Sequence, residues 1–173
     1  MTRKHFLKKF LPLLFFILFC GCGYQLAGKE THTPPGVNSI AIPTLANHTL
    51  EPGIEIQFTQ AFLREFIQDK RVKVVDRREA DSVLEGIIKS FTIFSVSYDK
   101  SGYALEYQTI AVIDITLKKK SGEILWKEKD LLERAWYRTN PSVIATEDNK
   151  VNAIQQIASS LAERIRTRFF YNF

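Results

Sequence analysis

The residue with the clearest chemistry is Cys22, which follows an apolar run near the start of the chain. Basic residues precede that run, and residues 10–19 are almost wholly apolar, as in a secretory signal. A small residue, Gly21, stands directly before the cysteine, as signal cleavage requires. The arrangement resembles a bacterial lipobox, in which the thiol is diacylated, the signal is cut before it and the new amine is acylated. We therefore expect a signal peptide over residues 1–21 and a lipid anchor on Cys22.

The apolar run itself is too short to be the anchor. Ten to twelve residues cannot cross a hydrocarbon core of about 30 Å as a helix, so the run is a signal and not a span. Acyl chains on Cys22 would hold the protein firmly, since each buried CH₂ contributes about 0.8 kcal/mol. The alternative is an ordinary secreted protein in which Cys22 is incidental. Removal of Cys20 with the signal leaves Cys22 as the last thiol, which excludes a disulfide framework.

Basic side chains are the second group with a chemical use. Four of them stand where a sheet would present them, at a hairpin tip or near strand ends: Lys100, Lys118, Lys120 and Arg138. Together with an apolar sheet face, such groups could grip a phosphorylated, anionic amphiphile. We therefore predict them as contacts for such a ligand. The alternative is that lysines at turns only keep edge strands soluble.

Other kinds of site find little support in the sequence. It has no G-x-S-x-G, no phosphate-cradling glycine loop and no H-E-x-x-H, so we do not expect an enzyme. His48 beside Glu51 is best interpreted as part of a solvated loop. After signal removal, neither His32 nor His48 has a second ligand at metal-binding spacing, so we predict no metal and no cofactor.

The charge balance argues against nucleic-acid binding. The full chain carries 24 basic and 19 acidic side chains, a net charge of +5, but four of the basic residues lie in residues 1–21. The mature chain is left with 20 basic and 19 acidic side chains, a balance of +1. Bulk binding to nucleic acid needs a much stronger basic field.

The sequence predicts a tether followed by one domain. Residues 22–36 are rich in Gly, Pro and Thr without an apolar period, and residues 37–173 are enough for one core. A short strand over 37–42 precedes a loop over 44–53 and a helix over 54–69, whose apolar residues recur at three- and four-residue spacing. A strand over 72–75 follows. Strand, helix and strand in this order favour a right-handed crossover between parallel strands.

Three long strands and a final helix complete the domain. The strands, rich in β-branched and aromatic residues, are predicted over 82–98, 105–118 and 124–138, with hairpin connections between them. The apolar phase slips near Ile93 and Phe94, and again near Val112 and Ile113, so we expect bulges or strong twist there. A helix follows over about 144–168. The aromatic end of the chain, 169–173, should either pack back on the domain or insert into a partner.

The predicted fold class is α+β. Its order is β-α-β-β-β-β-α, with a mixed, mostly antiparallel twisted sheet and two helices packed on one face. The other sheet face is then open to water or to a partner.

The order and spacing of several short segments, none specific alone, resemble the LptE family, the lipopolysaccharide-assembly lipoproteins of Gram-negative outer membranes. The segments are Cys22-Gly23-Tyr24-Gln25-Leu26, Pro34-Pro35-Gly36-Val37, Ile40-Ala41-Ile42-Pro43, Asn47-His48-Thr49, Glu51-Pro52-Gly53, Ala80-Asp81-Ser82-Val83-Leu84-Glu85-Gly86 and Glu106-Tyr107. The resemblance implies a non-enzymatic lipoprotein that plugs the large LptD barrel, helps it assemble and binds lipopolysaccharide. It also implies that Lys100 matches a position suited to phosphate contact. The segment Thr146-Glu147-Asp148-Asn149 is acidic where a second cation would be expected.

Two other interpretations stay open. A structural lipoprotein could scaffold another envelope complex, for secretion or efflux, without touching lipopolysaccharide. A periplasmic hydrolase would need a pocket with a nucleophile and a base, and the sequence offers none. Gly23 follows the cysteine in place of an aspartate, which predicts an outer-membrane lipoprotein that faces the periplasm.

Overall fold

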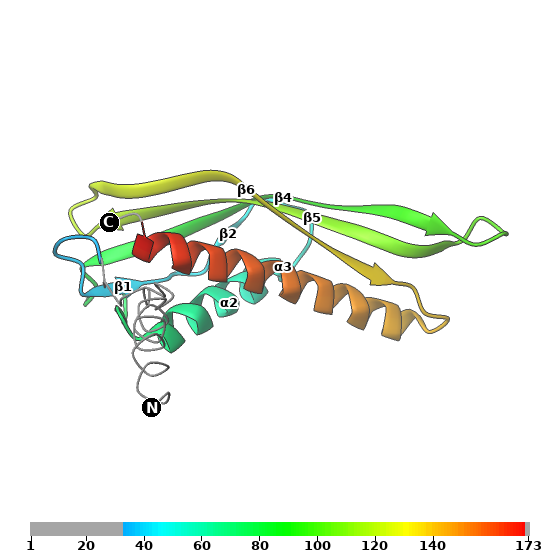
Figure 1. Cartoon of the computed structure of the whole chain (residues 1–173), viewed down its shortest axis with the longest axis horizontal. Helices are drawn as coiled ribbons and strands as arrows, with labels where there is room; N and C mark the ends of the chain where they lie inside the picture. Colours follow the sequence, from blue (N-terminus) through cyan, green and yellow to red (C-terminus); the bar gives the residue numbers. More distant parts are fainter. Residues whose placement is uncertain (1–32, 172–173) are drawn as a thin grey trace, which may run out of the picture. The chain divides into compact units, whose positions relative to one another are not determined.

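The computed structural model describes residues 33–171, which form one mixed sheet and two helices (Figure 1). The predicted signal peptide, Cys22 and most of the tether lie outside the described residues, as does Phe173. In chain order, the elements are β1 (Ser39–Ala41), β2 (Ala46–Asn47), α2 (Ile54–Asp69), β3 (Lys73–Val74), β4 (Ser82–Tyr98), β5 (Ala104–Lys119), β6 (Ile124–Arg138) and α3 (Val143–Tyr171).

The sheet combines a small parallel part with a long antiparallel meander. Its order is β3-β1-β4-β5-β6, and β2 pairs with β4 beside β1. β1 is parallel to both β3 and β4, whereas β4, β5 and β6 are antiparallel. The predicted α+β class is confirmed, β1 and β3 on either side of α2 are parallel as predicted, and the predicted element order holds for all the longer elements. The two-residue β2 lies within the segment predicted as a loop.

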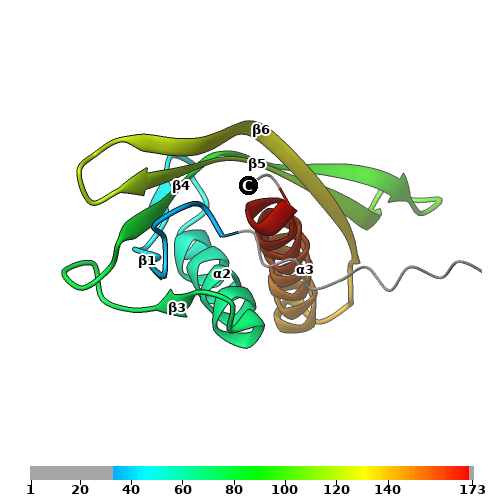
Figure 2. The same ribbon diagram turned by 60° about the vertical axis from the view of Figure 1, so that its left-hand side comes forward.

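Both helices pack on one face of the sheet, as predicted (Figure 2). Phe58 and Phe62 of α2 are fully buried, as are Leu161 and Ile165 of α3. Each helix therefore removes one apolar stripe from water against the same sheet face, and this burial drives the packing of the two layers.

The aromatic end of α3 packs back on the domain. Phe169 and Phe170 are buried beside Phe66 of α2, and the Phe66 and Phe169 rings meet edge to face with centroids 5.4 Å apart. Tyr171, by contrast, is exposed. Two of the terminal aromatics thus belong to the core and are not free to insert into a partner.

The two predicted changes in which alternate residues are buried, one in β4 and one in β5, have different explanations. In β4, the pairing with β5 shifts between Ile88 and Ser90, several residues before the predicted point. The buried side chains pass from Leu84 and Ile88 to Phe91, so a bulge at Lys89 changes which parity faces the helices.

The phase change predicted within β5 is wrong. Its odd-numbered residues, including Ala111, Ile113 and Ile115, face the core without interruption. Ile110 and Val112 lie on the opposite sheet face, and these two apolar residues among polar neighbours mimicked a slip. The irregularities expected near Val112 and Ile113 lie in the neighbouring strands. β4 shifts register opposite these two residues, and β6 shifts opposite Ile113–Ile115, where Asp130 has a positive φ of 55°.

Candidate functional site

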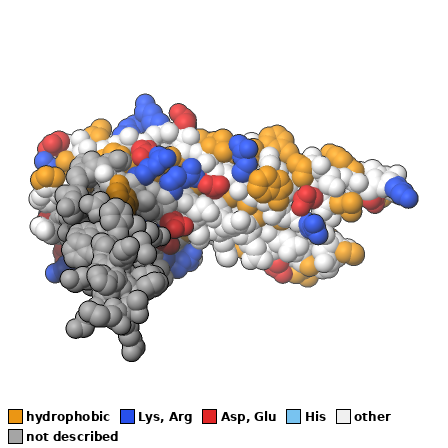
Figure 3. All heavy atoms as spheres, in the orientation of Figure 1, with side chains coloured by type: hydrophobic (Ala, Val, Ile, Leu, Met, Phe, Trp, Pro, Cys, Tyr) orange, Lys and Arg blue, Asp and Glu red, His pale blue; other side chains and the backbone are white. Residues whose placement is uncertain are grey.

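The sheet face that the helices leave open carries a group of apolar side chains toward the β4–β5 hairpin, whereas its other end is charged. Because residues opposite each other in register share a face, Phe94 and Trp136 lie together on either side of Gln108, and Leu132 lies beside Val112. Phe94 is 51% exposed and Trp136 50%. With Ile110, these side chains form what we call the outer apolar surface, defined as Phe94, Ile110, Val112, Leu132 and Trp136. Hydrophobic side chains are conspicuous over the half of the molecule toward the β4–β5 hairpin (Figure 3).

Lys100 stands at the far tip of that hairpin. The Asp99 carboxylate accepts hydrogen bonds from the backbone N–H groups of Ser101 and Tyr103, and Gly102 takes a positive φ of 86°. Asp99 and Gly102 thus stabilise the tight turn. The Asp99 carboxylate fixes the turn backbone by hydrogen bonds, and Gly102 adopts the left-handed region without strain. Lys100 is exposed, and no group within residues 33–171 forms an ion pair or hydrogen bond with it.

Arg138 lies at the same end of the sheet, at the last position of β6. Its side chain is 83% exposed, and the guanidinium approaches the Glu106 carboxylate of β5 only at 3.8 Å. It lines a hollow with Ser97 and Glu106, and a second hollow with Trp136 and residues of α3. Arg138 and Lys100 therefore present two cations near the exposed aromatic side chains of this end.

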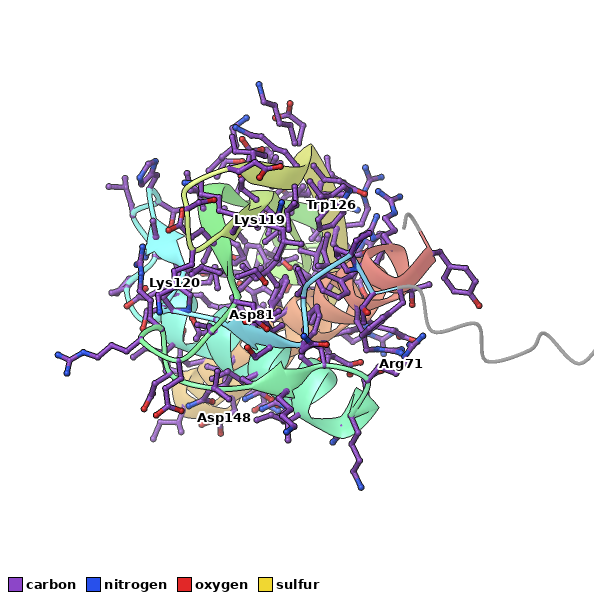
Figure 4. The ribbon with its side chains drawn as sticks, turned by 90° about the vertical axis from the view of Figure 1, so that its left-hand side faces the viewer. Arg71, Asp81, Lys119, Lys120, Trp126 and Asp148 are labelled. Atoms are coloured by element: carbon purple, nitrogen blue, oxygen red, sulfur yellow. The ribbon has the colours of Figure 1, made fainter. Side chains whose placement is uncertain are left out.

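Lys118 and Lys120 lie at the opposite end of the sheet and already have protein partners. The Lys118 ammonium is 2.6 Å from the Glu85 carboxylate, which also pairs with Arg77. Lys120 donates to the Arg78 carbonyl at 2.8 Å. Figure 4 views this end, with Lys120 and Asp81 labelled on adjacent segments that are joined by a backbone hydrogen bond.

The four predicted contacts therefore form two separate pairs. Arg138 is opposite Glu106, near the start of β5, whereas Lys118 lies near its end. At about 3.3 Å per residue, the intervening strand measures about 40 Å. A single charged headgroup cannot contact both ends at once.

Asp81, which lies in a charge-rich segment of the sequence, stabilises the fold by hydrogen bonds to β1. Its carboxylate accepts hydrogen bonds from the N–H groups of Asn38 and Ser39 and from the Ser39 hydroxyl. The backbone hydrogen bond from Asn38 and the one from the Ser39 side chain hold the pKa of Asp81 below its usual range. Asp81 therefore fastens β1 to the start of β4.

The described part of the chain shows no arrangement suited to metal-dependent chemistry. Within residues 33–171, His, Cys, Asp and Glu side chains nowhere gather in groups of three or more that could hold a metal ion. His48 is exposed, and its backbone N–H donates to the Ile88 carbonyl. Neither helix of this part of the chain is both long and apolar enough to cross a membrane.

Sequence reasoning missed the polar residues that α3 contributes. Asn149 donates to the Arg138 carbonyl at 2.9 Å, and Asn152 and Gln156 line the same hollow as Trp136. On the sequence, these residues belong to the polar face of an amphipathic helix and resemble any solvated face. Only the placement of α3 under β6 brings them to the end that carries Arg138.

Comparison with known proteins agrees with this architecture. The sequence model of the LptE family, described as lipopolysaccharide-assembly, matches residues 37–169. No curated protein matches the chain.

Several solved structures share the fold at low sequence identity. A lipoprotein B from Nitrosomonas europaea is similar with a TM-score of 0.58 and 12% identity, over 86% of this chain and 90% of that one. A minor lipoprotein from Acinetobacter baumannii has a TM-score of 0.54 and 12% identity, over 79% and 93% of the two chains. PelC from Paraburkholderia phytofirmans, a dodecamer, has a TM-score of 0.53 and 13% identity, over 78% and 90%.

Proposed function

The chain belongs to the LptE family, and from this premise we propose that it is an outer-membrane lipoprotein that plugs an LptD-type barrel and binds lipopolysaccharide. The observation that carries the proposal is the family match over residues 37–169, which spans nearly the whole described region. The family role is lipopolysaccharide assembly. The barrel partner, the bound lipid and the absence of enzymatic activity are the finer parts of the proposal.

The open sheet face supports a role in binding a large partner. A plug must present a broad surface to its barrel. Phe94, Leu132 and Trp136 of the outer apolar surface are exposed, whereas the opposite face is filled by α2 and α3. Monomeric proteins rarely leave large contiguous apolar patches in water, so an exposed patch favours an interaction site. We expect the barrel contacts to be spread over this face and not to depend on one residue.

The end that carries Lys100 and Arg138 supports the lipid-binding part of the proposal. Lipopolysaccharide is an anionic amphiphile, so its recognition needs cations beside apolar side chains. Lys100 has no competing partner within residues 33–171, and Arg138 is held only loosely by Glu106. We place the phosphate contacts at this end. Lys118 and Lys120 are weaker candidates because neighbouring groups already satisfy them.

Membrane attachment is proposed to rest on Cys22, which lies outside the described residues. Diacylation of the thiol would hold the domain at the periplasmic side of the outer membrane. Cys22→Ala should therefore release the protein or leave it in the wrong membrane, and the intact mass of the wild-type protein should include acyl chains. A soluble, unmodified wild-type protein would contradict this part.

Isolation from outer membranes in mild detergent tests the barrel partnership. The full chain, tagged at its C-terminus, should retain a stoichiometric LptD-type barrel. Val96→Glu with Trp136→Glu would place charge on two exposed apolar positions at the hairpin end and should reduce the recovered barrel. The matched control is Val143→Glu with Ile144→Glu, which changes two exposed apolar residues on α3. Recovery without any such barrel would overturn the proposal.

One observation favours a second candidate, a lipoprotein that scaffolds a different envelope complex. PelC has a similar fold and assembles as a dodecamer, so this architecture also occurs in a protein that forms a large assembly of its own copies. This function predicts co-purification of a different envelope complex, without lipopolysaccharide and without an LptD-type barrel. The same detergent isolation distinguishes the two functions.

A further inference from the structure

Within residues 33–171, the sheet has two long edges that no other strand covers, and the two edges differ in how they are protected. One is the outer side of β6, which pairs only with β5. The other is the distal half of β4, where pairing with β1 ends at Val83 and pairing with β2 ends at Ile88. Free edges expose unpaired N–H and C=O groups, and natural proteins usually blunt them with charge, bulges or cover.

The β6 edge shows all of these protective features. Its sequence includes Lys127, Lys129 and Arg134, and a bulge at Asp130 interrupts its pairing. Two of its carbonyls, at Leu132 and Arg138, accept hydrogen bonds from Arg164 and Asn149 of α3. The α3 side chains thus satisfy part of the backbone that another strand would need.

The distal edge of β4 lacks charge and cover, and its pairing with β5 is regular from Ser90 to Ser95, between the bulge at Lys89 and the register shifts at Ser95–Tyr98. Residues 90–98 read Ser-Phe-Thr-Ile-Phe-Ser-Val-Ser-Tyr, with no charged residue and no proline. Beyond the bond from the His48 N–H to the Ile88 carbonyl, no loop or side chain of the described region donates to or accepts from this edge. Figure 1 shows the β4–β5 hairpin extending past α2 and β2. In residues 90–98, the backbone N–H and C=O groups of alternate residues point away from β5 and are therefore available to another strand.

We propose that this edge pairs with the same edge of a second copy of the chain, antiparallel and about a two-fold axis near Phe94. This inference goes beyond the proposed function and does not depend on it. A two-fold interface places one surface against itself, so the surface must be self-complementary. Residues 90–98 meet this condition because their lack of charge leaves no like-charge pair in the antiparallel register. The β6 edge instead carries charges of both signs, which self-pairing would have to desolvate.

Pairing of this kind would also extend an existing apolar surface. Phe94 belongs to the outer apolar surface, and Val96 is 46% exposed. An antiparallel partner would place the same side chains beside them and shield part of each copy's apolar area from water. The sheets of the two copies would become continuous through β4.

Introduced cysteines can map the proposed contact. The full chain has only Cys20 and Cys22, so replacing both with Ser leaves one introduced cysteine as the sole thiol. In an antiparallel pair, opposed Cα atoms are about 4.5–5.5 Å apart, within the range that a disulfide bridges. In mild detergent, oxidation should cross-link copies most strongly near the axis, at Phe94→Cys or Ser95→Cys, and less at Ser90→Cys. The control Lys127→Cys, on the exposed part of β6, should give little dimer.

A charge variant tests the same edge without cross-linking. Val96→Lys adds a cation to the β4 edge of each copy, and Leu132→Lys makes a matched change at a similarly exposed position on β6. Sedimentation of the full chain in detergent should show a dimer that Val96→Lys weakens about tenfold or more, with Leu132→Lys close to wild type. Unchanged far-UV circular dichroism confirms that both variants fold. A monomeric wild type, or a dimer weakened only by Leu132→Lys, would overturn the proposal.

Discussion

At the scale of single residues, Lys100 and Lys118 carry the same charge in different surroundings. Lys118 is 2.6 Å from Glu85, whereas Lys100 projects from a tight turn with no partner in residues 33–171. A ligand phosphate would have to compete with a carboxylate for Lys118 but not for Lys100. The two lysines were predicted from the sequence to have the same role, but they differ in whether a carboxylate already pairs with them.

We expect Lys100→Glu to weaken lipopolysaccharide binding about tenfold or more. A charge-assisted hydrogen bond contributes about 1.5–3 kcal/mol, and about 1.4 kcal/mol corresponds to one decade in Kd. Lys118→Glu changes the net charge by the same amount and should have a smaller effect. Equilibrium binding of lipopolysaccharide to both variants measures the difference. A loss with Lys118→Glu but not with Lys100→Glu would move the site to the other end of the sheet.

At the scale of the elements, β4 comes unusually close to the segment that leads into β2. A Cβ at Gly86 would lie 2.6 Å from Leu45 Cγ and 3.0 Å from Ile115 Cδ1, so only a glycine lets these buried side chains approach. The Leu45 N–H donates to the Thr59 hydroxyl of α2, which limits how far this segment can retreat.

Gly86→Ala should therefore destabilise the fold by about 1–3 kcal/mol, as overpacking of a filled core does. Urea unfolding followed by circular dichroism measures the free energy of unfolding. The double variant Gly86→Ala with Leu45→Ala removes the clashing atoms and should cost less than the sum of the two single changes. Strict additivity would show that Leu45 is not the obstacle.

The two helix stripes should carry much of the stability. Phe62 and Leu161 are fully buried, so truncating either to Ala should cost about 2–5 kcal/mol through lost burial and the cavity left behind. The control is Leu50→Ala, because Leu50 is fully exposed and should change stability by less than about 0.5 kcal/mol. Costs below about 0.5 kcal/mol at both buried positions would contradict the packing of the helices on the sheet.

At the scale of the whole molecule, an ion-pair network fastens α3 to the end of α2. Arg166 contacts Glu65 and Asp69, each at 2.9 Å, and Arg71 also pairs with Asp69. The Arg71 guanidinium stacks on the Phe170 ring, 3.6 Å from its centroid. The network thus connects residues almost a hundred positions apart and closes the aromatic end of the core.

The network should make stability depend on pH in the acid range. Hydrogen bonds from Arg71 above all, and from Arg166, hold the pKa of Asp69 below its ordinary value of 3.8. A lowered folded pKa means that the stabilisation is complete above the ordinary value and is lost as the pH falls through the folded value.

Asp69→Asn should therefore cost about 1.5–3 kcal/mol at neutral pH. The difference from wild type should shrink as the pH falls below 3.8. Urea unfolding at neutral and acid pH measures both effects. Asp148→Asn, at an exposed position on α3 labelled in Figure 4, is the control and should leave the pH dependence unchanged. A constant difference between Asp69→Asn and wild type across this range would assign the effect to packing and not to charge.

Local patterns in the sequence predict the longer elements and the faces that the helices bury. The bounds predicted for α2, β4 and β6 agree with the structure, because apolar period, turn residues and the glycine before α2 are local signals. The family could also be recognised, since short segments in a characteristic order survive in the chain. The charged residues of the candidate site could be named as well, because exposed cations at turns are visible in a sequence.

How these elements meet depends on contacts between residues that are distant in the chain. Register assigns Ile110 and Val112 to the outer face, where the sequence suggested a phase slip, because a period-two pattern does not show which apolar residues face the core. Strand length places Lys100 and Lys118 at opposite ends of the sheet. The environment of each edge and each cation depends on neighbours distant in the chain, as with Asn149 beside Arg138, and local sequence carries no record of them.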